Sequence, residues 1–267
     1  MLAGDRSRFM EEVQGLQRGF PPHAAPVELL RECFARLARV SPCIEDCWDA
    51  RKAMNNRMLD LQSILKVRVR MASRSFRAAL RVALAGTRVD FLHADLDDIL
   101  ATIDELMSTS LPVDHGAALR ARMRRGANIL YIAGEAGEVV LDRMFIRSIP
   151  LSNITCVVAS TYGGLVASGQ DADYVGMRQS CHVLASGCGG PGVLLHHASE
   201  RLRELYREAD LIIAKGELQL ESLFPVHDER LFCLFTCRCE AVAETFGIAL
   251  GDTVVLSPTL RLRELRG

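Results

Sequence analysis

Residues 128–142 read NILYIAGEAGEVVLD and decide the fold of this 267-residue chain. An apolar run breaks at a glycine-flanked acidic turn, and the apolar residues then return at helical spacing, which predicts a β-strand, a sharp loop and an α-helix. In open α/β sheets, ligands bind beyond the carboxyl ends of strands, where helix N-termini present free N–H groups. We therefore expect residues 134–138 to border a ligand site; a plain strand-to-helix connection without chemistry is the alternative.

The C-terminal half of the chain continues this pattern, because short apolar runs alternate with helical segments. The apolar runs lie at 129–133, 154–160, 182–185, 211–214, 231–237 and 253–256, and the helical segments at about 138–147, 171–179, 199–208 and 240–246. Such alternation is typical of a mainly parallel sheet with right-handed crossovers. We predict a Rossmann-like α/β domain at 126–267, with helices on both faces of the sheet and the site at its edge.

The N-terminal half is helical in character. It is rich in Ala, Leu, Arg and Glu, and its apolar residues recur at helical spacing in segments 27–40, 49–71, 75–84 and 95–107, followed by a last helix that ends near Arg125. Proline and glycine residues separate these segments. The sequence therefore predicts a helical N-terminal subdomain at 1–125 that precedes the α/β domain.

Composition argues against a nucleic-acid-binding, membrane-spanning or secreted protein. The net charge is −1, from 32 basic and 33 acidic residues, so no overall field attracts nucleic acid or an anionic membrane. No apolar run approaches the roughly 18 residues that span a bilayer, and the N-terminus lacks the apolar core of a secretory signal. Nine cysteines, an odd number, suit free thiols in a reducing compartment. We expect a cytoplasmic protein with no nucleic-acid or membrane partner, and a protein partner stays open.

A lysine and a glycine end the most apolar of these strands. Residues 209–216 read ADLIIAKG, which delivers Lys215 and Gly216 to the carboxyl edge of the sheet. The compact charge of a lysine can meet a phosphoryl or carboxylate oxygen, and glycine lets backbone N–H groups approach the ligand. We predict that both residues bind substrate; the alternative is a surface lysine paired with Glu217 or Glu221.

Two further features are candidate contacts to a ligand. Residues 185–192 read ASGCGGPG, a glycine-rich loop in which Gly187 and Gly192 are predicted to help hold an anion. Asp171 follows Ser168 by three residues, so it suits either a helix cap or a ligand contact.

Several motifs together resemble one family, the metal-dependent damage-control phosphatases, once catalogued as a domain of unknown function. Residues 85–91, AGTRVDF, resemble the family's A-G-N-x-x-D-F, and residues 209–223, ADLIIAKGELQLESL, are similar to A-D-L-I-I-S-K-G-Q-G-N-F-E-x-L. Ser186-Gly187 and Pro191-Gly192 match a T-G…P-G loop, and Cys237-Arg-Cys239 resembles x-K-C. The resemblance covers about residues 42–256 and implies the same order of a helical part and an α/β domain. It also places Gln219 at a substrate-binding asparagine.

The chain departs from the family at the metal motifs. Where the family has G-D-N-A-G-E, residues 133–138 read AGEAGE, so Gly134 and Glu135 replace an aspartate and an asparagine ligand. A second motif, N-D-A-T-x-E-D-A, aligns with LVASGQDA at 165–172, which puts Val166 at another aspartate ligand. A magnesium-like cation needs several oxygen ligands, and only Glu135 keeps one. We therefore predict no metal ligands and no cofactor.

Three functions remain open from the sequence. The first is a repurposed enzyme that acts on a small phosphorylated or carboxylated metabolite without the metal, with Lys215 as anion clamp and Glu135 or Glu138 as catalytic acid or base. The second is a non-catalytic relative that binds a ligand or a partner chain. The third is a phosphatase with an unusual metal shell that includes Glu135 and Asp171.

Overall fold

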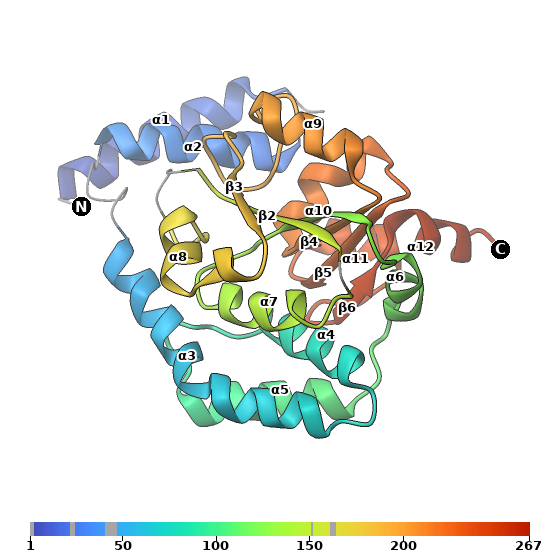
Figure 1. Ribbon diagram of the computed structural model, residues 1–267. Coiled ribbons are helices and arrows are strands. Elements are labelled where there is room, and N and C mark those ends of the chain that lie inside the picture. The colour runs from blue at the N-terminus through green and yellow to red at the C-terminus, as the bar shows by residue number, and fades with distance from the viewer. Residues whose placement is uncertain (1–2, 22–24, 41–46, 151, 161–163) are drawn as a thin grey trace.

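A six-stranded sheet forms the centre of the computed structural model, which describes residues 3–21, 25–40, 47–150, 152–160 and 164–267 (Figure 1). The strands are β1 (Asn128–Ile132), β2 (Asn153–Val158), β3 (His182–Ala185), β4 (Leu211–Lys215), β5 (Leu231–Thr236) and β6 (Thr253–Leu256). Their order is β3-β2-β1-β4-β5-β6, and only the pairing of β6 with β5 is antiparallel. The predicted α/β fold with a mainly parallel sheet is confirmed.

The strand order reverses direction at β1, which defines where a ligand site can form. The chain moves outward from β1 to β2 and β3, then returns to β4 on the other side of β1. Ile129 is paired with both Ile154 and Leu211, so β1 lies between β2 and β4. The loops that leave β1 and β4 diverge at this point, and a crevice at such a reversal is the usual ligand site of open α/β sheets.

Both faces of the sheet are buried, because successive side chains of a strand point to opposite faces. Ile129 and Tyr131 belong to one apolar core cluster, and Leu130 and Ile132 belong to the other. This explains why the strands are continuous apolar runs, as expected for a sheet covered by helices on both sides.

Helices cover both faces of the sheet (Figure 1). On the first face lie α3 (Trp48–Met71), α4 (Ser75–Ala85), α5 (Leu96–Ser108), α7 (Glu138–Ile146) and α8 (Gly169–Tyr174). Among these, α3 packs against α4 and α7, and α5 packs against α4. On the second lie α9 (Glu200–Glu208), α10 (Glu217–Leu223), α11 (Glu240–Phe246) and α12 (Pro258–Glu264). α6 (Gly116–Arg122) precedes β1, so the helix predicted to reach Arg125 ends three residues earlier. The helix predicted at 171–179 is divided into α8 and a 3₁₀ turn, Met177–Gln179, because Gly176 has a φ of +72°.

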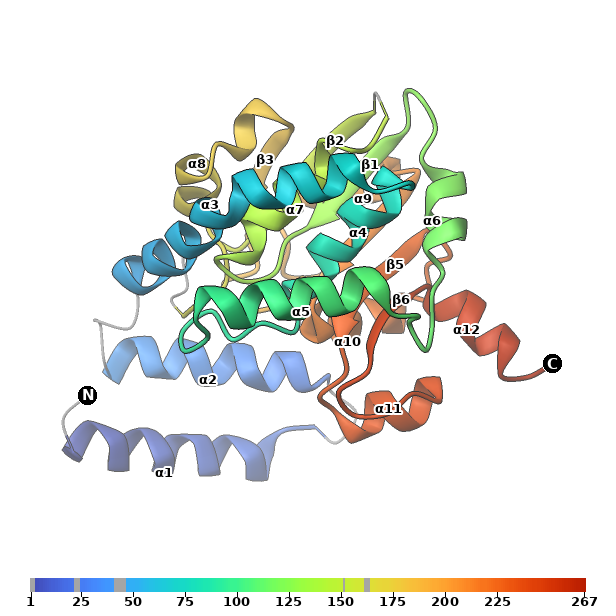
Figure 2. The same cartoon turned by 90° about the horizontal axis from the view of Figure 1, so that it is seen from below.

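Two further helices, α1 (Ala3–Gly19) and α2 (Pro26–Val40), lie side by side at the margin of the molecule (Figure 2). α2 joins them to the rest of the chain through the glycine-rich loop. A Cβ atom built on Gly190 would overlap Arg31, and one on Gly192 would lie 2.7 Å from Val27. No helix in the described ranges combines the length and the apolar character that a membrane crossing requires.

Candidate functional site

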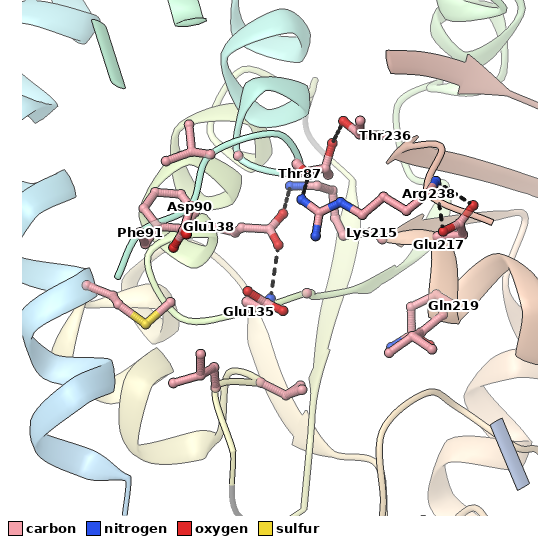
Figure 3. Close-up of a pocket in the computed structure, with 18 of the residues that line it drawn as sticks. Thr87, Asp90, Phe91, Glu135, Glu138, Lys215, Glu217, Gln219, Thr236 and Arg238 are labelled. Carbon is pink, nitrogen blue, oxygen red and sulfur yellow. Dashed lines mark hydrogen bonds and ion pairs between the residues drawn. The ribbon is translucent and has the colours of Figure 1, made fainter. Parts of the chain in front are cut away.

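A pocket of about 580 Å³ opens at the carboxyl ends of β1, β4 and β5 (Figure 3). Its floor and walls come from the segment that follows α4, from the β1–α7 and β2–α8 loops, and from the start of α10. The polar and charged residues that line it are Thr87, Asp90, Glu135, Glu138, Lys215, Glu217, Gln219, Thr236 and Arg238. The predicted strand-edge site is therefore a real cavity, built from segments far apart in sequence.

The β1–α7 and β2–α8 loops are paired with each other. The Ala136 N–H donates to the Leu165 carbonyl at 2.8 Å, and the Ala167 N–H donates to the Gly134 carbonyl at 3.0 Å. These bonds place Glu135 opposite Val166 in an antiparallel bridge. The two motifs that carry metal ligands in the resembled family therefore meet at one place in this fold.

The side chains at that place do not fit a magnesium-like ion. Gly134 offers no ligand atom, Val166 is apolar, and Glu135 is the one oxygen-bearing side chain of the three. A Cβ atom at Gly134 would lie 2.7 Å from Glu138 Oε1, so the Glu138 carboxylate takes up the space beside it. Across the described ranges, no group of three His, Cys, Asp or Glu side chains is arranged to hold a metal. A hard divalent ion needs more oxygen ligands than this.

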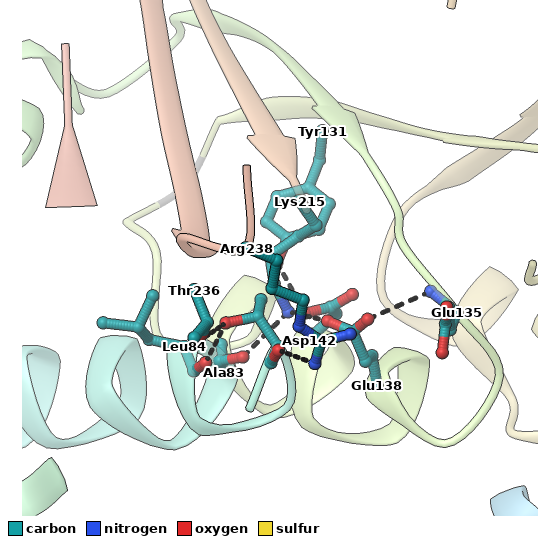
Figure 4. Close-up of polar contacts among 10 residues, drawn as sticks. Ala83, Leu84, Tyr131, Glu135, Glu138, Asp142, Lys215, Thr236 and Arg238 are labelled. Carbon is teal, nitrogen blue, oxygen red and sulfur yellow. Dashed lines mark hydrogen bonds and ion pairs between the residues drawn. The ribbon is translucent and has the colours of Figure 1, made fainter. Parts of the chain in front are cut away.

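Lys215 lies at the bottom of the pocket within a buried polar network (Figure 4). Its Nζ donates to the Ala83 carbonyl at 2.8 Å and to Asp142 Oδ1 at 2.7 Å, and it forms an ion pair with Glu138 Oε2 at 2.8 Å. Two of its donors thus make hydrogen bonds, and the Glu138 carboxylate balances its charge as an ion pair. Lys215 thus connects the end of α4 to the first turns of α7. Its predicted contact with a ligand stays a prediction.

The network perturbs the ionisation of its members. Burial lowers the pKa of Lys215, but the Asp142 and Glu138 carboxylates more than offset this, so the net pKa is raised. Burial raises the pKa of Asp142 although Lys215 opposes the shift. The Tyr131 hydroxyl donates to Asp142 Oδ1 at 2.7 Å, and burial together with that carboxylate raises the tyrosine pKa. Lys215 is therefore held in its charged form.

Glu135 has an exposed side chain that lines the pocket. Its backbone N–H donates to Glu138 Oε1 at 3.2 Å, whereas no ion pair or hydrogen bond of its own carboxylate occurs among the described residues. Partial loss of solvent raises the pKa of Glu135, the nearby Glu138 and Asp90 charges raise it further, and Arg238 opposes the shift. A raised pKa brings a carboxyl group closer to the values that general acids and bases have.

Arg238 supplies the pocket's second cationic side chain, and the prediction of site residues omitted it. It follows β5 directly, and its backbone N–H donates to both oxygens of Glu217, at 3.0 and 3.1 Å. Its guanidinium donates to the Thr87 carbonyl at 3.1 Å but forms no ion pair within the described part of the chain. Its position just after a parallel strand, in the segment that resembles x-K-C, is the sequence signal that could have identified it.

Three other predicted residues also line this pocket. Gly216, with a φ of +90°, turns the chain from β4 into α10, a conformation that favours glycine. Gln219 Oε1 accepts a hydrogen bond from the Val193 N–H at 2.9 Å, and Gly192 lies beside it. The structure thus brings these three together with Glu135, Glu138 and Lys215.

Two predicted residues lie outside the pocket lining. Gly187 packs against the start of α9, where an added Cβ atom would lie 2.8 Å from the Ser199 nitrogen. Asp171 is fully buried and accepts hydrogen bonds from Ser168, Arg51 and Asn55, at 2.7 to 3.0 Å. Asp171 therefore closes a capping box at the start of α8, the structural alternative considered for it.

Comparison with other proteins agrees with the fold. A crystal structure of the DUF89-family protein PH1575 from Pyrococcus horikoshii matches with a TM-score of 0.87 at 24% identity, covering 97% of this chain and 91% of that chain. In sequence, the damage-control phosphatase PH1575 is 29% identical over 191 residues, which are 70% of this chain and 67% of that protein.

Two further comparisons bear on the family. The uncharacterized protein MJ0202 from Methanocaldococcus jannaschii is 28% identical over 188 residues, which are 67% of this chain and 62% of its own length. A family model described as the damage-control phosphatase ARMT1-like domain matches residues 3–254. The chain therefore belongs to the family of damage-control phosphatase ARMT1-like domains.

Proposed function

We propose that this protein binds a small phosphorylated metabolite in the β1–β4 pocket and acts on it without the divalent metal of the resembled phosphatases. In this proposal Arg238 holds the anionic group and Glu135 transfers a proton. Lys215 supports the pocket from below instead of contacting the phosphate.

The proposal rests on the position of the Arg238 side chain and on its lack of an ion pair. It lines the pocket, it is exposed, and its guanidinium has no carboxylate partner among the described residues. A guanidinium presents several N–H donors in a planar arrangement that suits phosphate and carboxylate oxygens. Among the described residues the guanidinium donates one hydrogen bond, to the Thr87 carbonyl, so further donors remain for a ligand.

The side chains at the resembled metal positions support the metal-free part of the proposal. Gly134 and Val166 contribute no oxygen ligand, and Glu138 is engaged with Lys215. The third function considered from the sequence, a metal shell that includes Glu135 and Asp171, has little support, because Asp171 is buried and hydrogen-bonded elsewhere.

Glu135 supports an enzyme over a passive binder. Its carboxylate faces the pocket, and burial raises its pKa above the usual value, toward the values that general acids and bases have. A non-catalytic relative is the second candidate, because a phosphate-binding Arg238 by itself requires no proton transfer.

Binding of ethyl phosphate in the presence of EDTA tests the anion site. We expect the Arg238→Ala variant to bind at least about tenfold more weakly than the wild type, since a charge-assisted contact is lost. Arg88→Ala is the matched control, because Arg88 is exposed, pairs with Glu105 and does not line the pocket. Equal affinity of the wild type and the Arg238→Ala variant would refute the proposal.

A turnover screen of phosphorylated metabolites in EDTA then separates the enzyme from the binder. If the protein is an enzyme, the wild type should convert at least one of these metabolites, and Glu135→Gln should convert it much more slowly. If ethyl phosphate binds but no phosphorylated metabolite is converted, the non-catalytic candidate replaces the enzyme.

A further inference from the structure

The charges that line the pocket divide into paired and unpaired groups. Lys215 and Glu138 form an ion pair at the floor. The Glu217 carboxylate accepts hydrogen bonds from two backbone N–H groups, those of Arg238 and Cys239, at 3.0 to 3.1 Å. Asp90 shares a hydrogen bond with His93 at 2.8 Å and accepts one from the Leu92 N–H at 3.0 Å. Each of these three carboxylates already has partners within the protein.

Two opposite charges are left without an ion pair among the described residues, the Glu135 carboxylate and the Arg238 guanidinium. Both belong to the lining of one pocket, yet they do not pair with each other. Figure 3 shows Glu135 on the β1–α7 loop and Arg238 reaching in from the end of β5, on opposite sides of the Glu138 carboxylate. Arg238 still lowers the pKa of Glu135, so the two charges interact at a distance too long for direct contact.

A partly desolvated charge without a partner is costly, and a ligand with the opposite charge removes that cost. An anion alone would satisfy Arg238 but would face repulsion from Glu135. An ammonium group alone would satisfy Glu135 but would face repulsion from Arg238. A molecule that carries both charges, separated by a short carbon chain, satisfies both ends at once.

The pocket that holds the two charges also has apolar lining, which suits the carbon chain of a ligand. Val166 lies opposite Glu135, Phe91 packs beside Gly137, and Leu218 lines the pocket near the start of α10. These apolar side chains require no hydrogen bonds from the ligand, so recognition depends on the two charged ends.

We propose that the pocket is specific for an amino-substituted phosphate ester, with its ammonium group against Glu135 and its phosphate at Arg238. This inference rests on the proposed function and names its substrate class. It assigns Glu135 a second role, recognition of a cation, which a pocket for simple phosphate esters would not need.

The experiment compares two probes that differ only by an ammonium group, O-phosphoethanolamine and ethyl phosphate. Their affinities are measured in EDTA by ligand-observed NMR at millimolar concentrations. We expect the wild type to bind O-phosphoethanolamine about tenfold more tightly, as one charge-assisted contact provides. Glu135→Gln should abolish this preference, because an uncharged amide no longer attracts the ammonium group.

Glu105→Gln is the matched control, because Glu105 is an exposed acid outside the pocket lining, and it should keep the preference. Equal binding of the two probes to the wild type would overturn this inference and leave the proposed function standing. A preference that survives in Glu135→Gln would also overturn it. Binding of neither probe, or binding of either only after addition of Mn²⁺, would overturn both.

Discussion

Lys215 illustrates how one residue can have a different role from the one its sequence position indicates. It follows β4, where a lysine commonly meets a ligand anion, but its ammonium group is fully buried and has three protein partners. Arg238, which follows β5 and lacks an ion pair among the described residues, is better placed to meet an anion.

Lys215→Met is expected to destabilise the fold by about 3–5 kcal/mol, because Glu138 and Asp142 would remain buried without their cation. Urea unfolding measures the change. Lys52→Met is the control, since Lys52 is exposed and its Nζ lies 5.8 Å from the centre of the Tyr174 ring, and its effect should stay within about 1 kcal/mol. A Lys215→Met variant as stable as the Lys52→Met variant would contradict the network described here.

The wild type and the Lys215→Met variant should also differ in how their free energy of unfolding depends on pH. The folded pKa of Lys215 is raised above its unfolded value of 10.5, so its stabilising contribution is complete below pH 10.5 and is lost as the pH rises through the folded pKa. From pH 9 upward, the difference in free energy of unfolding between the wild type and Lys215→Met should first stay constant. It should then become smaller above pH 10.5. Urea midpoints at successive pH values measure it, and a difference that widens there would show the opposite shift.

The site could be predicted in part, because strand ends are visible in the sequence. Glu135 and Gly216 line the pocket, as that rule implies, and Gln219 lines it as the family resemblance implies. The partners of Lys215 were not predictable, since Ala83 lies 132 residues away in sequence and Asp142 is four positions beyond Glu138, inside an apolar helix. Such tertiary contacts decide whether Lys215 or Arg238 is available to a ligand, and the sequence does not show them.

At the scale of elements, the pairing of the β1–α7 and β2–α8 loops places Val166 opposite Glu135. Val166→Asp would add a second carboxylate there, and we expect it to raise the affinity for Mn²⁺ at least about tenfold over the wild type. Calorimetric titration measures this. Leu218→Asp, in the same pocket but on α10, is the control and should bind Mn²⁺ no better than the wild type. Tight one-to-one Mn²⁺ binding by the wild type would contradict the account.

The glycine-rich loop serves α2 as a docking surface, which its sequence did not reveal. Gly190→Ala is expected to cost about 1–3 kcal/mol, since its Cβ atom would overlap Arg31 on α2. Hydrogen exchange across residues 26–40 should rise. Gly169→Ala is the control, because a Cβ atom there would meet nothing within 4 Å. Unchanged protection of α2 in Gly190→Ala would refute this docking.

Apolar patterns predicted the strands and several helices. All six strands and the helices α3, α7, α9 and α11 lie within a few residues of their predicted ranges. The helices α10 and α12 were not predicted, although they have seven residues each, as α11 does. Two turns give few apolar repeats, so the pattern alone does not distinguish such a helix from a loop. In the structure both α10 and α12 pack against β5.

For the whole molecule, the order of apolar runs and helices was enough to predict the fold, because parallel strands and right-handed crossovers leave few alternatives. The division at residues 125 and 126 stays a prediction. Met58 and Leu84 of the helical part share one core cluster with Ile129 and Tyr131 of the sheet. Any separation of the two parts would therefore expose apolar surface on both.

The central claim is that the pocket binds a phosphate group through Arg238 and needs no divalent metal. It is tested most directly by the affinity of the wild type for ethyl phosphate, measured in EDTA and again with excess Mn²⁺. The account predicts the same dissociation constant in both conditions. Binding that is absent in EDTA and restored by Mn²⁺ would contradict it.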